Sequence, residues 1–176
     1  MYRLTTRKIA FSGLEAAVYT ALTMVISPWG YGPVQFRISE VLCILPFFFP
    51  ASVWGLFIGC VLSNLLSSYG IYDIVFGSLA TLLAGLCTMW IGRIRPQSVL
   101  TKALACLPPV IFNALIVSWV IVLNTPSESY GLTALTVGLG EFGVLFLFGL
   151  PALVFLPKTN FFRALQSLYF RQIEQQ

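Results

Sequence analysis

The sequence predicts an all-α integral membrane bundle of six transmembrane helices, and three observations lead to this fold class. Of the 176 residues, 58% are hydrophobic and 9% are charged, whereas a soluble domain is about 45–50% apolar and about 25% charged. The length limits the chain to roughly six spans of about 20 residues with their loops. The basic residues lie at the ends of apolar runs, which indicates membrane topology and not nucleic-acid binding.

Hydropathy divides the chain into six apolar segments that form a single domain, 1–176. We expect helices at residues 7–26, 39–49, 52–68, 74–91, 103–123 and 131–156. The second segment is too short to cross a bilayer squarely, and Pro46 and Pro50 should kink or end it. We therefore expect this helix to begin within the sequence QFRISE, Gln35–Glu40, and to be covered by its neighbours.

Six spans place both chain ends, and the loops near residues 50–52 and 93–102, on one side of the membrane. Nine of the ten Lys and Arg residues fall on that side. By the positive-inside rule this side is cytoplasmic, so we predict a multi-pass protein of the cell (plasma) membrane with both termini in the cytoplasm. The exception is Arg37, which needs another explanation than topology.

Polar side chains inside the apolar runs are the candidates for a binding site, because a charge at mid-helix costs about 2.5–3.5 kcal/mol on insertion scales. With the predicted orientation, five of them converge on one cavity in the outer half of the bundle: Glu40, Asn64, Asp73, Asn113 and Glu141. The neighbouring candidates are Trp29, Gln35, Arg37 and Tyr72. Aromatic side chains beside carboxylates predict a pocket that stacks a flat ring and binds its polar edge.

Several of these residues also have structural interpretations. Arg37 and Glu40 are spaced as an i, i+3 ion pair on an emerging helix, and Asp73 suits an N-cap for a helix that starts at Ile74. Trp29 and Tyr72 fit an interfacial aromatic belt.

Asn64 and Asn113 also fit hydrogen bonds between helices. Glu141 is harder to explain structurally, because no Lys or Arg lies within two turns of it. Glu15 falls in a predicted span nearer the cytoplasm, and the sequence assigns it no role.

Common catalytic and cofactor motifs are missing from the sequence. There is no histidine, no CxxC pair and no GxxxxGK[ST] loop, so we expect no metal site, no cofactor, no nucleotide hydrolysis and no enzyme of the Ser-His type. The letters GLGEFG, residues 138–143, match the dinucleotide fingerprint, but they lie within a predicted span where small residues allow close packing. The four cysteines stand singly in apolar runs and are interpreted as packing residues.

The first helix carries small residues at intervals of four: Gly13, Ala17 and Ala21. Such a ridge allows another helix to pack at short distance. The partner is either a helix of the same bundle or a separate membrane subunit.

Four stretches of the sequence resemble the QueT family of queuosine-precursor transporters. They are YGPVQFRISEVLCILPFFFP, GLFIGCVLSNLLSSYGIYDIVFGSLATLLAG, PPVIFNALIV and TALTVGLGE, and the resemblance extends from about Thr6 to Pro157. It implies the substrate-binding S component of an energy-coupling factor (ECF) transporter, which captures 7-aminomethyl-7-deazaguanine or a close relative from outside. It also implies partners, namely a transmembrane coupling protein and two ABC ATPases, with Ala17–Ala21 as the AxxxA motif that docks to the coupling protein.

The resemblance also suggests roles for the polar residues. A carboxylate accepts the two donors on the edge of a deazaguanine, and a second carboxylate binds the cationic aminomethyl arm. Glu40 or Glu141 is expected at the guanine-like edge, and Asp73 or the other glutamate at the ammonium. Arg37 is expected to orient Glu40.

Two other functions remain open from the sequence. One is a self-sufficient secondary transporter driven by protons through Glu141 and Glu40. The other is a membrane enzyme with Glu40 and Asp73 as an acid and base pair.

Overall fold

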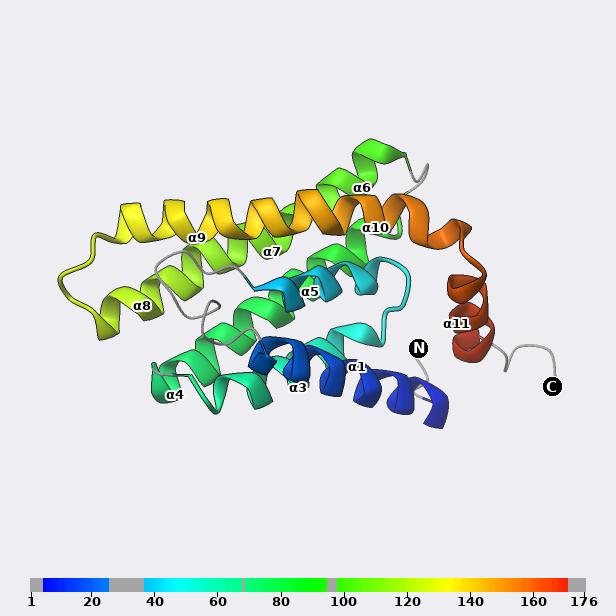
Figure 1. The fold of residues 1–176 in the computed structure, drawn as a ribbon, viewed down its shortest axis with the longest axis horizontal. Helices are drawn as coiled ribbons and strands as arrows, with labels where there is room; N and C mark the ends of the chain where they lie inside the picture. The colour runs from blue at the N-terminus through cyan, green and yellow to red at the C-terminus, as the bar shows by residue number, and fades with distance from the viewer. Residues whose placement is uncertain (1–4, 26–36, 68, 95–97, 171–176) are drawn as a thin grey trace.

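The computed structural model describes residues 5–25, 37–67, 69–94 and 98–170, and its regular elements are all helical (Figure 1). The elements are α1 (Thr6–Val25), η1 (Ile38–Phe47), α3 (Ser52–Asn64), α4 (Gly70–Tyr72), η2 (Asp73–Gly77), α5 (Ser78–Ile91), α6 (Val99–Ala105), α7 (Leu107–Phe112), η3 (Asn113–Val117), α8 (Ser118–Asn124), α9 (Tyr130–Val144), η4 (Leu145–Gly149), α10 (Leu150–Phe155), η5 (Leu156–Lys158) and α11 (Asn160–Phe170). Adjoining elements merge, so the described residues form seven helical segments.

Three of these segments are long and apolar enough to cross a membrane: Gly70–Ile91, Val99–Asn124 and Tyr130–Lys158. They contain the predicted helices 74–91, 103–123 and 131–156, each of which the structure extends by up to four residues at an end. The apolar helices η1 and α3 are shorter, and α1 carries Arg7, Lys8 and Glu15. The helical bundle is therefore confirmed, and the count of six crossings stays a prediction.

The chain reverses direction in the order expected for a bundle of successive passes. In Figure 1, α1 begins, η1 turns into α3, α5 ends, α6 begins and α10 ends at one end of the molecule. We call it the basic end, defined by Arg7, Lys8, Arg93, Lys102 and Lys158. The far end carries α4 and the turn between α8 and α9.

Glycines of α3 allow α1 to lie unusually close to it. A Cβ at Gly55 would lie 2.7 Å from the Ser12 carbonyl oxygen and 2.8 Å from Glu15 Oε2, and one at Gly59 would lie 3.0 Å from the Ala16 carbonyl oxygen. Small residues four apart permit this kind of backbone approach between helices. The close approach of α1 and α3 therefore depends on glycine, which has no side chain, at Gly55 and Gly59.

Replacing Gly55 by alanine should destabilise the fold, because the added methyl group collides with backbone atoms that cannot move independently. The cost of overpacking is about 1–3 kcal/mol, and a lower midpoint of thermal unfolding in detergent would report it. Gly13→Ala is the matched control, since no atom lies within 4 Å of a Cβ at that position. An equal midpoint for the two variants would contradict this account of the crossing.

The second segment, η1, is a 3₁₀-helix that lies inside the bundle. It begins at Ile38, within the QFRISE stretch as expected, and contains Pro46, whose missing N–H removes one helical hydrogen bond. Ile44 and Phe47 are 2% and 5% exposed and pack with Leu145 and Leu153 in one hydrophobic cluster. The segment is thus covered by its neighbours, as its shortness requires.

Each of the three long helices contains one π-helical turn. These turns are η2, η3 and η4, and the first two begin at the polar residues Asp73 and Asn113. η2 packs against η3, and η3 packs against α9. A π turn contains one more residue than an α turn and is frequent at functional sites, so Asp73 and Asn113 lie at candidate functional positions.

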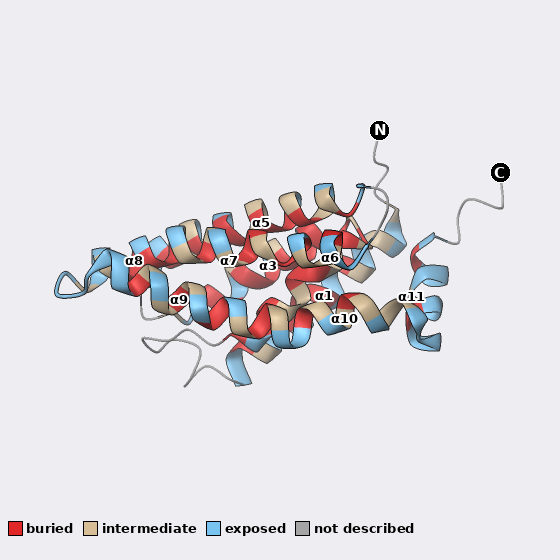
Figure 2. Ribbon diagram, turned by 90° about the horizontal axis from the view of Figure 1, so that it is seen from above, coloured by how far each residue is buried: buried red, intermediate tan, exposed pale blue. Residues whose placement is uncertain are grey.

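The amphipathic helix α11 was not expected from hydropathy. It packs against the basic end through Phe162 and Tyr169, which are 2% and 4% exposed, and Tyr169 Oη accepts a hydrogen bond from the Ala51 N–H at 2.9 Å. Its other face is exposed, in contrast to the buried faces of the bundle helices (Figure 2). The spacing of Phe162, Leu165 and Tyr169 is the sequence signal that predicts this helix.

Candidate functional site

A group of polar side chains, here called the polar cluster, lies buried in the bundle. Each member is 5% exposed or less. The members are Tyr19 of α1, Arg37 and Glu40 at the start of η1, Asn64 of α3, Asp73 of η2, Asn113 of η3 and Glu141 of α9. Five of the six predicted spans contain a member of this cluster, and Asp73 directly precedes the predicted helix at 74–91.

Glu40 is held by two donors from different helices. Tyr19 Oη donates to Glu40 Oε1 at 2.5 Å, and Cys43 Sγ donates to Glu40 Oε2 at 3.0 Å. Sequence reasoning missed Tyr19, although Glu15, Tyr19 and Thr23 recur at intervals of four on the buried side of α1. This row of polar residues in an apolar helix is the sequence signal that indicates a buried polar role for Tyr19. Cys43 is a hydrogen-bond donor in addition to a packing residue.

Asp73 lies at the centre of a second set of contacts. Its Oδ2 accepts a hydrogen bond from Ser67 Oγ at 2.5 Å and lies 3.8 Å from Arg37 Nη2. Asn64 Nδ2 donates to the Asp73 carbonyl oxygen at 2.9 Å. A Cβ at Gly77 would lie 2.8 Å from both Asn64 Nδ2 and Asp73 Oδ1, so glycine at this position leaves room for both side chains.

Glu141 connects to the cluster from α9. Asn113 Nδ2 donates to Glu141 Oε1 at 3.2 Å. Small residues let α9 and η3 come this close. A Cβ at Gly138 would already lie 3.2 Å from the Ala114 Cβ. The charges of Glu40 and Arg37 act on Glu141 as well, and Arg37 is also the ion-pair partner of Asp73.

Three buried acceptors of this cluster have no hydrogen-bond donor among the described residues: Asn64 Oδ1, Asp73 Oδ1 and Glu141 Oε2. Buried polar atoms are normally paired, and leaving one unpaired costs about 1–3 kcal/mol. The cluster also holds three carboxylates against the guanidinium of Arg37, a formal excess of two negative charges. Chemically, it is suited to a ligand that brings hydrogen-bond donors and positive charge.

Two structural interpretations of the sequence are wrong. Asp73 is not an N-cap, because its helix begins at Gly70 with Tyr69 in the capping position. The ion pair of Arg37 in the structure is formed with Asp73, whereas the i, i+3 spacing predicted Glu40. The reason is that η1 directs the Glu40 side chain to Tyr19 and Cys43.

Other predicted site residues are not part of the polar cluster. Tyr72 lies next to Asp73 in sequence, but its side chain is 50% exposed, so stacking by Tyr72 stays a prediction. Trp29 and Gln35 lie outside the described residues.

The small-residue ridge lies on the surface of the bundle. Gly13, Ala17 and Ala21 are all exposed, while α1 packs on α3 through its other face, with Ser12, Ala16 and Tyr19 buried. Among the described residues nothing covers this ridge, and docking to a separate membrane subunit stays a prediction.

Glu15 is buried at the α1–α3 crossing, with a 6% exposed side chain. Its carboxylate lies beside Ser52 and above Gly55. Glu15 is therefore a residue of the contact between α1 and α3 and not a member of the polar cluster.

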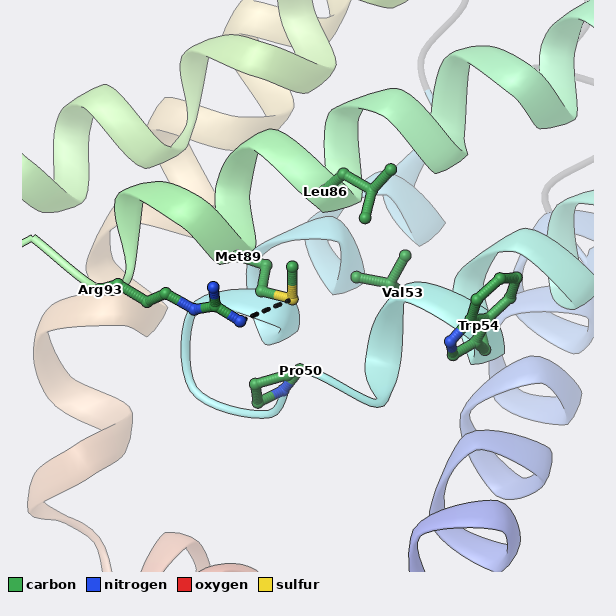
Figure 3. Close-up of a pocket in the computed structure, with 6 residues that line it drawn as sticks. All are labelled: Pro50, Val53, Trp54, Leu86, Met89 and Arg93. Carbon is green, nitrogen blue, oxygen red and sulfur yellow. Dashed lines mark hydrogen bonds between the residues drawn. The ribbon is translucent and has the colours of Figure 1, made fainter. Parts of the chain in front are cut away.

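A pocket of about 200 Å³ lies at the basic end (Figure 3). It is lined by Pro50, Val53, Trp54, Leu86, Met89 and Arg93. None of the predicted site residues that the structure describes lines it. Within the described ranges, no group of three or more metal-ligating side chains comes together.

Comparisons with known proteins agree with the resemblance in the sequence. The chain is 39% identical, over 85 residues, to the protein named queuosine precursor transporter QueT of Lactococcus lactis subsp. cremoris (strain MG1363). That alignment covers 47% of this chain and 50% of the relative, so the chain matches about half the length of that relative. No solved structure matches the chain significantly. The model of the QueT transporter family matches residues 9–158, and the chain therefore belongs to the QueT transporter family, which is a family of transporters and not of enzymes.

Proposed function

We propose that this chain is the substrate-binding S component of an ECF importer, which binds a queuosine precursor such as 7-aminomethyl-7-deazaguanine from outside the cell. The observation that carries this proposal is the polar cluster, with three unpaired buried acceptors and an excess of carboxylates over cations. The name of the Lactococcus relative supports the substrate class.

The chemistry of the ligand suits this cluster. The N1–H and exocyclic amine of a deazaguanine are adjacent donors that a carboxylate accepts in a bidentate manner. The aminomethyl arm is a cation at neutral pH and is stabilised by a second carboxylate. A ligand of this kind supplies both the donors and the positive charge that the cluster lacks.

The three carboxylates differ in how much of their hydrogen-bonding capacity is used. Both oxygens of Glu40 have donors, whereas Glu141 Oε2 and Asp73 Oδ1 have none among the described residues. We therefore assign direct ligand contacts to Glu141 and Asp73, with Glu141 at the guanine-like edge. Glu40 contributes negative charge and holds the site together through α1 and η1.

The proposed membrane orientation has the basic end in the cytoplasm and six crossings. It is supported by the positive-inside rule and by the alternation of the helices between the two ends (Figure 1). Arg37, Asn64 and Asp73 lie at the helix ends nearest the far end, so a ligand would enter from outside.

The proposed partners are a membrane coupling protein and two ABC ATPases. The exposed ridge of Gly13, Ala17 and Ala21 supports docking of a partner helix, because small exposed residues at spacing four allow close contact between helices in a membrane.

A calorimetric titration of the purified chain in detergent tests the proposal. We expect tight binding of 7-aminomethyl-7-deazaguanine and weaker binding of guanine, which lacks the cationic arm. Folded protein that binds neither compound would refute the assigned substrate. Uptake into liposomes that contain this chain alone, abolished by an uncoupler, would instead establish a proton-driven secondary transporter.

A further inference from the structure

The pocket at the basic end has a chemistry different from that of the polar cluster. Val53 on α3 and Leu86 and Met89 on α5 form apolar walls, and Pro50 of the η1–α3 turn closes one side (Figure 3). No carboxylate or amide side chain lines it. It therefore offers no side-chain oxygen acceptor for the donor edge of a deazaguanine, and its side chains suit a largely apolar occupant.

The two ends of the pocket are marked by different side chains. Arg93 lies at one end, beyond Met89, and Trp54 lies at the other, beyond Val53 (Figure 3). The indole of Trp54 is 51% exposed. A half-exposed Trp and a basic residue beside an apolar surface are typical of the boundary between the hydrocarbon core and the lipid headgroups.

Arg93 has an exposed guanidinium at the end of α5. Within the part of the chain that the structure describes, its Nη2 lies 4.0 Å from Met89 Sδ, and it forms no ion pair. A thioether is a weak acceptor, so the charge of Arg93 is available to an anion from outside the chain.

The surroundings favour an anion as well. The basic end carries Arg7, Lys8, Lys102 and Lys158 in addition to Arg93. The acidic residues of the described ranges lie elsewhere, in the interior or, for Glu128, in the α8–α9 turn of the far end. An occupant of this pocket therefore meets positive charge at its polar end.

We propose that this pocket binds an anionic phospholipid from the membrane leaflet at the basic end. One acyl chain lies along Val53, Leu86 and Met89, and the phosphate lies at Arg93. The guanidinium fork matches phosphate oxygens in a bidentate manner. The apolar walls remove the start of the acyl chain from contact with other lipids. Trp54 borders the acyl chain at the edge of the pocket opposite Arg93 (Figure 3).

Occupancy of this site has a consequence for the bundle. The η1–α3 turn and the start of α3 form one wall, and α5 forms the other. A lipid that binds the folded protein and not the unfolded chain stabilises the fold through mass action. Anionic lipid should therefore raise the unfolding temperature of the detergent-purified protein through this site.

The test is native mass spectrometry of the full-length protein titrated with phosphatidylglycerol and with phosphatidylcholine of the same acyl chains. We expect tighter binding of phosphatidylglycerol, and about fivefold weaker binding in Arg93→Gln, the effect of one basic residue near a lipid surface. Arg163→Gln is the matched control, because Arg163 is an exposed basic residue of α11 outside the pocket. Phosphatidylcholine should bind both variants equally.

A second variant tests the apolar part. Leu86→Trp fills the pocket and should remove the first phosphatidylglycerol adduct, while an unchanged midpoint of thermal unfolding in lipid-free detergent verifies that the variant is folded. Equal loss in Arg93→Gln and Arg163→Gln would overturn the proposal, because it would show diffuse attraction to a basic surface. An unchanged first adduct in Leu86→Trp would overturn it too. Precursor binding is independent of these outcomes, so a failure here differs from a failure of the proposed transport function.

Discussion

Replacing Glu141 by glutamine is expected to weaken binding of 7-aminomethyl-7-deazaguanine by about 30-fold. The two hydrogen bonds from the guanine-like edge to the carboxylate contribute about 1.5–3 kcal/mol each, and the amide of glutamine cannot accept both. Glutamine keeps the volume of the side chain and can still accept a hydrogen bond from Asn113, the donor to Glu141 Oε1, so the fold should persist. Isothermal titration calorimetry of the purified variant gives the dissociation constant.

Glu128→Gln is the matched control for this measurement. Glu128 is exposed in the turn between α8 and α9, and the same change of charge there should leave binding unaltered. If Glu141→Gln bound the precursor as tightly as the unmodified protein, the assignment of the guanine-like edge to Glu141 would be wrong.

Replacing Ala17 and Ala21 together by leucine is expected to abolish uptake and to leave precursor binding intact. Both alanines are exposed on the side of α1 that faces away from α3, so larger side chains there do not disturb the bundle. They do prevent close approach of a partner helix. Uptake is measured in liposomes that contain the complete complex with ATP, and binding is measured on the isolated chain.

The control is Ala164→Leu, which enlarges an exposed alanine on α11. Uptake should persist in this variant. Full uptake by the variant with leucine at 17 and 21 would exclude this ridge as the docking surface, whereas loss of precursor binding would show that the ridge supports the site itself.

Helix positions follow from the sequence because apolar runs and turn residues act locally. The predicted helix at 7–26 is α1, Thr6–Val25, and the predicted helix at 52–68 begins at Ser52 as α3 does. Local patterns fail where the helix type depends on packing. The π turns and the 3₁₀ geometry of η1 leave no clear periodic signal, and α11 is too polar for a hydropathy criterion.

The residues of the polar cluster were easier to predict from the sequence than their hydrogen-bond and ion-pair partners. Buried Glu40, Asp73 and Glu141 stand out because charge in an apolar segment is costly. Their partners come from other helices, and which oxygen meets which donor depends on the rotation of each helix about its axis. For that reason the sequence paired Arg37 with its near neighbour Glu40, and it overlooked Tyr19, which lies 21 positions from the carboxylate it contacts.

The π turns make the long helices sensitive to length as well as to composition. Deleting one residue after Asp73–Gly77, in the α-helical part of α5, would rotate Asp73 and the turn before it by about 100° relative to the rest of the helix. Asp73 would then leave the interior even though every contacting residue was still encoded. A deletion inside the π turn would remove its extra residue and keep the flanking turns in register. The same reasoning applies to Asn113–Val117, so the position of a deletion should decide whether the polar cluster survives.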